Sequence, residues 1–207
     1  MTEIKIFGNM AKVYLIKEED SCVLVDTGIK FDRKSIYNYI KNEKVDLIIL
    51  THYHIDHIAN AHYLSKELEI PIAMSEVDYD IVKNGNEPKL YPYDFVGRIL
   101  KITSKMINPI SNLDMFDIDV FLKNKQSLEK FGINGTVYSL PGHTKGSIGL
   151  MVDNDKFFVG DAMMNHFSPS PSKIFENKEE MLQSVDFIKN SSASIIYTGH
   201  GKPFKNM

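Results

Sequence analysis

The sequence lacks the features that mark disulfide-linked, secreted or membrane-spanning proteins. It contains one cysteine, Cys22, so no internal disulfide can form, and we expect this side chain to pack as a small apolar residue. No apolar run approaches the length that crosses a membrane, and residues 1–8 alternate polar and apolar residues without the apolar core of a signal peptide. These absences predict a soluble, cytoplasmic protein.

The chain also lacks an excess of charge of either sign. Its formal net charge is -3, and charged residues make up 25% of the sequence. Such a balance creates no field that would attract nucleic acid or an anionic membrane, so neither is expected as a partner. The length of 207 residues does not require two domains, and we expect residues 1–207 to form a single domain.

Apolar periodicity predicts alternating strands and helices, which favours an α/β (α+β) fold. In the first half, strands are expected at 3–7, 12–16, 21–25, 45–50 and 71–74, and helices at 31–42 and 59–68. In the second half, strands are expected at 119–122, 136–140, 147–152, 156–159 and 194–197, and a helix at 178–189. The first three strands are typical of an antiparallel meander, and the four from 119 to 159 of a second one.

Two segments interrupt this alternation of strands and helices. Residues 84–115 carry several glycines and prolines and then an amphipathic pattern at 94–106, which predicts a helical insertion packed on the core. The alternative is that this insertion is a lid over the substrate pocket. Residues 168–172 alternate serine and proline, a composition typical of an exposed loop.

The densest group of reactive side chains follows the predicted strand at 45–50. Within residues 52–57 lie three histidines and an aspartate: His52, His54, Asp56 and His57. Alternate residues of an extended chain face the same way, so His52 and His54 can point to one site, whereas a turn at 56–57 redirects the next two side chains. This arrangement suits two adjacent metal ions better than one.

Three more candidate ligands, His143, Asp161 and His200, each follow a predicted strand directly and have a glycine as neighbour. Glycine permits tight turns, and loops at strand ends are where a rigid sheet positions reactive groups. Imidazole and carboxylate together suit zinc, manganese or iron, and the absence of a cysteine ligand points away from a closed structural zinc site. The sequence therefore predicts an open, catalytic metal site.

The order His-x-His-x-Asp-His, followed by histidine, aspartate and histidine at strand ends, resembles the metallo-β-lactamase fold superfamily. Residues 26–28 and 141–147 are similar to the same superfamily, so the resemblance covers nearly the whole chain. It implies a four-layered αβ/βα sandwich with the metals at one edge of the sheets. It also implies one metal on His52, His54 and His143, a second on Asp56, His57 and His200, and Asp161 as the bridge between them.

The resemblance also indicates which branches of the superfamily the chain does not fit. True β-lactamases generally lack a bridging carboxylate at the position of Asp161, so an antibiotic-destroying role is not expected. Glyoxalase II is similar in its full ligand set, but it carries a C-terminal helical region that helps to hold glutathione, whereas this chain stops at Met207.

We therefore expect a dinuclear metal-dependent hydrolase that acts on an ester, thioester or lactone-like bond of a small molecule. Two adjacent cations lower the pKa of a shared water, so that a hydroxide bridging them becomes available near neutral pH. Asp56 is the catalytic candidate, because it can ligate the second metal and also shuttle a proton. Zinc is the expected metal, with manganese and iron as alternatives. Whether the chain forms a homo-oligomer is left open.

An oxygenase is the competing interpretation. Persulfide dioxygenases resemble the same histidine-rich stretch but use a single iron, which here would lie on His52, His143 and Asp161. The sequence does not distinguish the two reactions, because the ligand residues alone do not determine which metal binds. Metal content and oxygen uptake would separate them.

Three residues beside the ligands are candidates for substrate binding: Tyr53, Lys145 and His166. Tyr53 either packs against the sheet or presents its hydroxyl to the pocket. Lys145 would bind an anionic group, and His166 would contact the substrate or support a ligand. Three phenylalanines suggest a pocket that accepts a hydrophobic group: Phe95, Phe116 and Phe167.

Overall fold

A six-stranded sheet forms the first half of the protein. The computed structural model describes residues 2–99, 101 and 113–206. The strands follow the order β1-β2-β3-β4-β5-β7; they are β1 (Glu3–Phe7), β2 (Val13–Glu18), β3 (Ser21–Val25), β4 (Leu47–Ile49), β5 (Ile72–Met74) and β7 (Val120–Phe121). The antiparallel pairing of β1, β2 and β3 confirms the predicted first meander, and β3, β4, β5 and β7 pair in parallel.

A five-stranded sheet forms the second half, in the order β15-β14-β10-β9-β8. Its strands are β8 (Gly135–Ser139), β9 (Ile148–Val152), β10 (Lys156–Phe158), β14 (Ile195–Tyr197) and β15 (Phe204–Lys205). Between β10 and helix α6 (Lys178–Lys189) lie the short strands β11 (Met163–Met164), β12 (Ser170–Pro171) and β13 (Ile174–Phe175). Helix α6 has the bounds that its apolar periodicity predicts.

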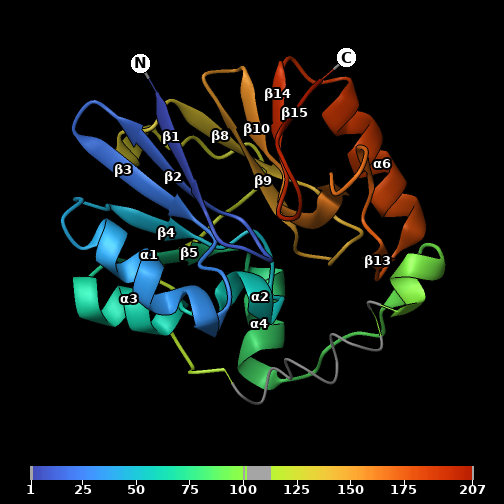
Figure 1. Cartoon of the computed structure of the whole chain (residues 1–207), viewed down its shortest axis with the longest axis horizontal. Helices are drawn as coiled ribbons and strands as arrows, with labels where there is room; N and C mark the ends of the chain where they lie inside the picture. Colours follow the sequence, from blue (N-terminus) through green and yellow to red (C-terminus); the bar gives the residue numbers. More distant parts are fainter. Residues whose placement is uncertain (1, 100, 102–112, 207) are drawn as a thin grey trace.

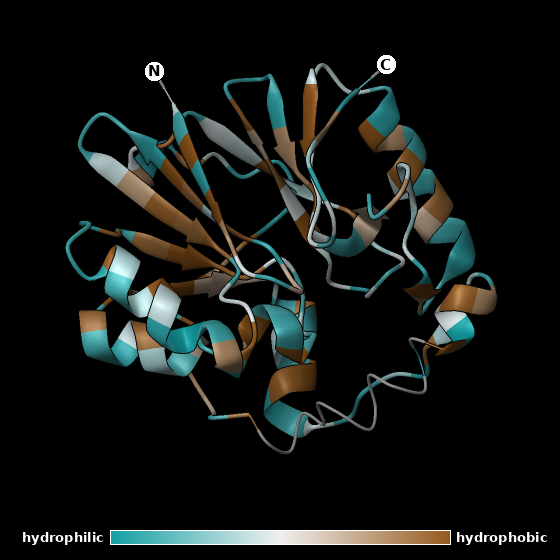
Figure 2. Cartoon of the chain, in the orientation of Figure 1, coloured by the Kyte–Doolittle hydropathy of each residue, from teal (hydrophilic) through white to brown (hydrophobic). Residues whose placement is uncertain are grey.

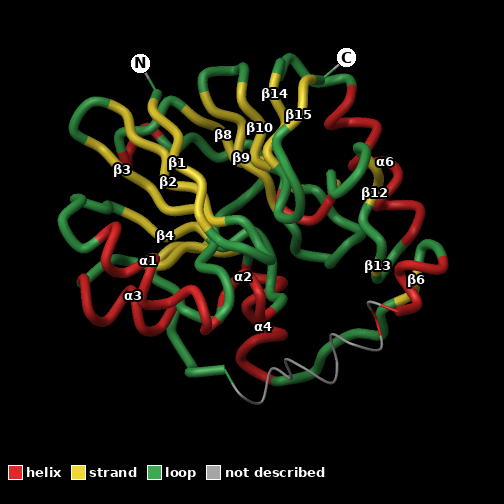
Figure 3. The backbone as a smooth tube through the Cα atoms, viewed as in Figure 1, coloured by secondary structure: helices red, strands yellow, loops and turns green. Residues whose placement is uncertain are grey.

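Helices cover the outer faces of both sheets, so the elements form four layers (Figures 1 and 3). Helices α1 (Arg33–Ile40) and α3 (Ala61–Leu68) flank the first sheet, and α6 flanks the second. The short helix α2 (Ile55–Ile58) and helix α4 (Glu76–Asn84) lie where the first sheet ends, near the second half. No helix in the described part of the chain is both long and apolar enough to cross a membrane.

Each layer boundary has its own apolar core. The faces that the two sheets turn toward each other contribute a cluster that includes Val23, Ile49 and Leu150, all at most 1% exposed. Figure 2 shows the apolar residues along the strands and the polar ones on the outer faces of the helices. Cys22 is 3% exposed and belongs to the cluster under α1 and α3, as its predicted packing role requires. The expected four-layered αβ/βα sandwich is confirmed.

The second meander was predicted one strand too long. Residues 119–122 contribute β7, which pairs in parallel with β5 of the first sheet and has no place in the second sheet. Asp119 fixes this pairing, because its carboxylate accepts a hydrogen bond from the backbone N–H of Ile72 at 2.8 Å. Apolar alternation identifies a strand but does not say which sheet receives it.

One expectation about a loop was partly wrong, and one about a pocket residue was wrong. Ser170 and Pro171 pair with β11, and Ser172 is completely buried, so residues 168–172 are not simply an exposed loop. Phe116 is 7% exposed and packs in the core under the first sheet, so it does not line a substrate pocket. Phe95 and Phe167 are exposed. Composition predicted the loop, but tertiary contacts override composition at single residues.

The inserted segment contacts the second half of the protein. Strand β6 (Tyr91–Pro92) pairs antiparallel with β13, and the backbone N–H of Tyr93 donates to the carbonyl of Lys173 at 2.8 Å. Residues 95–99 are helical, in agreement with the predicted helix at 94–106 as far as the described residues reach; the rest of that prediction, apart from residue 101, lies outside them. The segment therefore crosses from the first sheet to the segment before α6 (Figure 1).

Candidate metal centre

All seven predicted ligands lie at one edge of the two sheets, in groups whose ligand atoms are within 4.8 Å of one another. The stretch from His52 to His57 leaves β4 and enters α2, and His200 follows β14. His143 lies in the turn after β8, and Asp161 lies in the single 3-10 turn after β10. Strand ends from both sheets thus bring together residues that are far apart in the sequence.

The first group consists of His52, His54 and His143. The Nε2 atom of His143 lies 2.9 Å from Nδ1 of His54. His52 and His143 are buried, and burial is the main cause that lowers the pKa of His52 well below its usual value and the pKa of His54 to about 3. Neutral imidazoles have a free lone pair, which is the form that binds a metal ion.

The second group consists of Asp56, His57 and His200. Nε2 of His200 lies 3.1 Å from Oδ2 of Asp56 and 3.4 Å from Nε2 of His57. Burial acts to raise the pKa of Asp56, but the imidazoles of His57 and His200 outweigh it and hold the pKa below its ordinary value. The carboxylate therefore stays ionised, as a metal ligand must be.

Asp161 lies between the two groups. Its Oδ2 is 3.6 Å from Nε2 of His143 and 3.3 Å from Nε2 of His200, and its Oδ1 is 3.4 Å from Nε2 of His57. The side chain is 4% exposed, and burial acts to raise its pKa, but His200 and His57 hold the pKa well below the ordinary value. This is the position that a bridging carboxylate would occupy; the ligand roles themselves stay predictions.

Buried polar atoms without partners identify what the centre would hold. Nε2 of His52, Nε2 of His54 and Oδ1 of Asp161 are buried and have no hydrogen-bond partner. Leaving such atoms unpaired away from water costs about 1–3 kcal/mol each. A metal ion accepts lone pairs such as those of His52 and Asp161, and His54 turns its Nδ1 toward the first group, so the donor set fits divalent metal ions.

Partners on the outer nitrogens decide which way the imidazoles face. Nδ1 of His57 donates to Oδ2 of Asp26 at 2.7 Å, so Nε2 is the ring nitrogen that faces the centre, 3.4 Å from Oδ1 of Asp161. Asp26 also accepts hydrogen bonds from the backbone N–H and the hydroxyl of Thr51, at 2.8 and 2.9 Å. Asp26 was not predicted as a site residue, although its place at the end of β3, two residues before Gly28, was the signal that could have found it.

His143 and His200 are oriented in the same way by other groups. Nδ1 of His143 donates to the carbonyl of Ile174 at 2.9 Å and lies 2.8 Å from the hydroxyl of Ser172, and Nδ1 of His200 donates to the carbonyl of Met10 at 3.0 Å. Such partners fix the ring orientation and the tautomer of a metal-binding histidine. Sequence patterns do not reveal them, because two are backbone carbonyls and Ser172 lies in a segment predicted to be exposed.

The three predicted substrate contacts have different surroundings. Tyr53 is 1% exposed, and its hydroxyl donates to Glu176 at 3.2 Å, which is the packing alternative of the two interpretations. Lys145 is exposed, and its backbone N–H donates to the same carboxylate at 2.9 Å. The ring of His166 is exposed and its centroid lies 5.9 Å from that of His200. Substrate contact by Lys145 and His166 stays a prediction.

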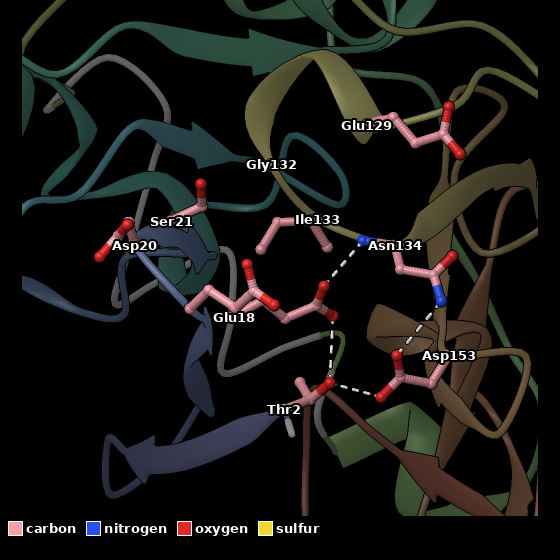
Figure 4. Close-up of a pocket in the computed structure, with 10 residues that line it drawn as sticks. Thr2, Glu18, Asp20, Ser21, Glu129, Gly132, Ile133, Asn134 and Asp153 are labelled. Atoms are coloured by element: carbon pink, nitrogen blue, oxygen red, sulfur yellow. Dashed lines mark hydrogen bonds between the residues drawn. The ribbon is translucent and has the colours of Figure 1, made fainter.

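A separate pocket of about 530 Å³ lies at the opposite ends of the strands, beside the β2–β3 and β9–β10 turns (Figure 4). Two of its carboxylates have partners within the fold: Glu18 accepts from the backbone N–H of Asn134 at 2.9 Å, and Asp153 accepts from Lys156 at 2.9 Å and from Thr2. The paired state of these groups contrasts with the unpaired ligand atoms of the metal centre.

Comparisons with known proteins point to the same family. A family model described as the Metallo-beta-lactamase superfamily matches residues 7–200. A hydroxyacylglutathione hydrolase of Vibrio campbellii is 29% identical over 194 residues, which cover 91% of this chain and 61% of that protein. The metallo-beta-lactamase fold-containing protein ST1585 of Sulfurisphaera tokodaii is 26% identical over 170 residues, which cover 78% of this chain and 60% of that protein.

A solved structure shows the same fold. The metallo-beta-lactamase family protein TTHA1429 from Thermus thermophilus superimposes with a TM-score of 0.73 at 19% identity, over 99% of this chain and 75% of that one. The chain spans about three fifths of the length of the curated relatives named above.

Proposed function

Because the chain belongs to the metallo-β-lactamase superfamily, we propose that it is a hydrolase that works with two divalent metal ions bound between its sheets. The observation that carries this proposal is the pair of buried atoms Nε2 of His52 and Oδ1 of Asp161, which have no hydrogen-bond partner and lie with His57 in a ligand group that joins the first group to the second. A protein with no metal to bind would gain stability by replacing these atoms with apolar ones.

Each group of side chains has a defined task in this proposal. The first metal would be held by His52, His54 and His143, the second by Asp56, His57 and His200, and Asp161 would reach both. When bound, such ions supply a nucleophilic hydroxide near neutral pH and polarise the carbonyl oxygen of the substrate.

Asp56 is the group of the centre best placed to move a proton. Its side chain is 26% exposed, whereas that of Asp161 is 4% exposed, so Asp56 is the carboxylate that substrate and solvent can reach. After the attack it would take up the proton that the nucleophile oxygen still carries and pass it to the leaving group. The buried Asp161 would hold its charge and set the spacing of the two groups.

The substrate we propose is a small molecule with an ester, thioester or lactone-like bond. A hydroxyacylglutathione hydrolase is among the relatives, so a hydroxyacyl conjugate of a thiol is the first compound to test. Zinc is the first metal to test, followed by manganese and iron. A single domain, a cytoplasmic location and the absence of nucleic-acid and membrane partners remain part of the proposal.

The test combines metal analysis with a substrate panel. We expect two zinc, manganese or iron ions per chain, hydrolysis of at least one ester, thioester or lactone, and loss of this activity after chelation. One iron per chain together with oxygen uptake on a persulfide would replace the hydrolase with the oxygenase alternative. Failure to hydrolyse any member of the panel at any metal loading would overturn the proposal.

A further inference from the structure

A buried carboxylate outside the metal centre joins the two turns that carry the first ligand group. Asp78 lies in helix α4 and is 0% exposed. Its Oδ2 accepts hydrogen bonds from the backbone N–H of Tyr53 at 3.0 Å and from the hydroxyl of Thr144 at 2.7 Å. Its Oδ1 accepts a hydrogen bond from the backbone N–H of Gly146 at 2.7 Å. One side chain thus binds both turns.

The bonded groups are direct neighbours of the ligands in the chain. The N–H of Tyr53 belongs to the peptide that follows His52, and Thr144 follows His143. A shift of either turn would lengthen a hydrogen bond to Asp78. The carboxylate therefore fixes the distance between the stretch that carries His52 and His54 and the turn that carries His143.

The fit around Asp78 leaves little freedom of movement. A Cβ atom at position 146 would lie 2.3 Å from Oδ1 of Asp78 and 2.5 Å from Oγ of Ser75, so the close approach requires glycine. Ser75 caps α4 by accepting a hydrogen bond from the backbone N–H of Asp78 at 3.3 Å. The cap fixes the first turn of the helix and, with it, the backbone position from which the Asp78 side chain extends.

A second carboxylate makes a parallel connection nearer the surface. Glu176 accepts hydrogen bonds from the hydroxyl of Tyr53 at 3.2 Å and from the backbone N–H of Lys145 at 2.9 Å, so it links the same two turns. Two acidic side chains, one from α4 and one from the residues between β13 and α6, therefore connect the same two turns. Such a duplicated connection is expected where the separation of the two turns matters.

Burying a carboxylate is unfavourable unless its hydrogen-bonding capacity is filled. Burial raises the pKa of Asp78 to about 7, against the lowering effect of the hydrogen bonds from Thr144, Tyr53 and Gly146. An apolar side chain would fill the same space without this cost. The polar connection of the two turns gives a reason for the acid at this position.

We propose that Asp78 is a positioning residue that sets the geometry of the first ligand group and thereby its affinity for metal. The inference rests on the proposed function, since it requires His52, His54 and His143 to bind a metal ion. Asp78 itself touches none of the reacting atoms. Its effect passes through the backbone of Tyr53 and through Thr144.

The test is a cobalt(II) titration of metal-free protein, with the absorption spectrum of the bound cobalt as a record of its ligand geometry. The variant is Asp78→Asn, which keeps the volume but turns an amide NH₂ toward a hydrogen-bond donor. We expect one uptake step to weaken by about tenfold or more, with an altered spectrum, and the other step to stay unchanged. In a His200→Ala background, which disables the second group, the remaining step should weaken by the same factor.

Asp46→Asn is the matched control. Asp46 also accepts a hydrogen bond from a strand backbone, the N–H of Cys22 at 2.8 Å, but neither residue lies in the ligand turns. The control should leave both uptake steps and the spectrum as in the wild type. An equal weakening in Asp46→Asn would mean that general destabilisation explains the loss, and would overturn the inference.

The remaining outcomes separate the inference from the proposed function. Wild-type protein that takes up no cobalt contradicts the proposed function, and the inference falls with it. Wild-type protein that binds two ions beside an Asp78→Asn variant with unchanged affinity and spectrum overturns the inference alone. If Asp78→Asn does not fold, Thr144→Val removes one of the hydrogen bonds; a weaker first step supports the inference, and an unchanged one overturns it.

Discussion

Single hydrogen bonds decide how the imidazoles of the centre face. His57 donates through Nδ1 to Asp26, and His200 donates through Nδ1 to the carbonyl of Met10. In both residues Nε2 is thereby the ring nitrogen that faces the centre. The backbone of Asp26 has a φ of 59°, a left-handed conformation that aspartate and asparagine tolerate better than most residues. A carboxylate at this position thus satisfies both the backbone and His57.

Asp26→Asn should weaken metal binding by the second group by about 10- to 100-fold. Asparagine suits the left-handed backbone, but it has one acceptor oxygen where Asp26 uses two, on His57 and on Thr51. Competition with a chromophoric zinc chelator measures the change, and Asp46→Asn is again the control. Wild-type zinc affinity in Asp26→Asn would mean that Asp26 does not orient His57.

Cys22 should be unreactive while the protein is folded. Its side chain is 3% exposed, and burial raises the pKa of its thiol to about 12, so the nucleophilic thiolate is scarce near neutral pH. A disulfide reagent that releases a chromophore should label the native protein far more slowly than protein unfolded in guanidinium. Equal rates in the two states would contradict the buried position.

At the scale of elements, periodicity predicted those whose apolar residues repeat over several turns or strands. Helix α6 was predicted with its observed bounds, and the first meander with its pairing. Helix α4 was not predicted, although Ser75 followed three residues later by Asp78 is a typical helix start. Strand β7 was predicted but placed in the wrong sheet, because pairing depends on contacts distant in the sequence.

The candidate site, too, has a part that the sequence predicted and a part that it did not. The ligand candidates could be found because histidine and aspartate at strand ends are conspicuous in type and spacing. The groups that orient them could not, because the carbonyls of Ile174 and Met10 have no side-chain signature and Ser172 lies among exposed-looking residues. Sequence reasoning therefore found what would touch the metal and missed most of what holds it in place.

Helix α6 offers a prediction about local stability. Its first residue follows Asn177, whose side chain accepts hydrogen bonds from the backbone N–H groups of Glu179 and Glu180 at 3.0 and 3.3 Å. Asn177→Ala should lower the free energy of unfolding by about 1 kcal/mol, because these helix N–H groups lose their acceptor. Denaturation by urea measures the loss. Asn177→Ser keeps an acceptor and should recover most of it; no difference between the two variants would contradict the capping role.

At the scale of the whole molecule, the candidate centre connects the two halves. His52, His54, Asp56 and His57 come from the first sheet, whereas His143, Asp161 and His200 come from the second. An ion bound to either group would therefore cross-link the halves in addition to their shared apolar core. Since the ligand atoms come together only in the folded state, metal binding and folding are coupled.

Metal loading should therefore raise the stability of the entire protein. A metal that binds only the folded state adds about 2.7 kcal/mol per site when its free concentration is about one hundred times the dissociation constant. We expect thermal unfolding of the zinc-loaded protein at a distinctly higher temperature than that of chelator-treated protein, with the midpoint rising as zinc is added.

Asp161→Ala provides the matched variant for this experiment. It removes the carboxylate that approaches His143 and His200 at 3.6 and 3.3 Å, so one or both metals should be lost and most of the zinc-dependent rise with them. Unchanged metal stoichiometry in Asp161→Ala would overturn the bridging role, whereas a wild-type midpoint that does not respond to zinc would contradict metal binding between the sheets.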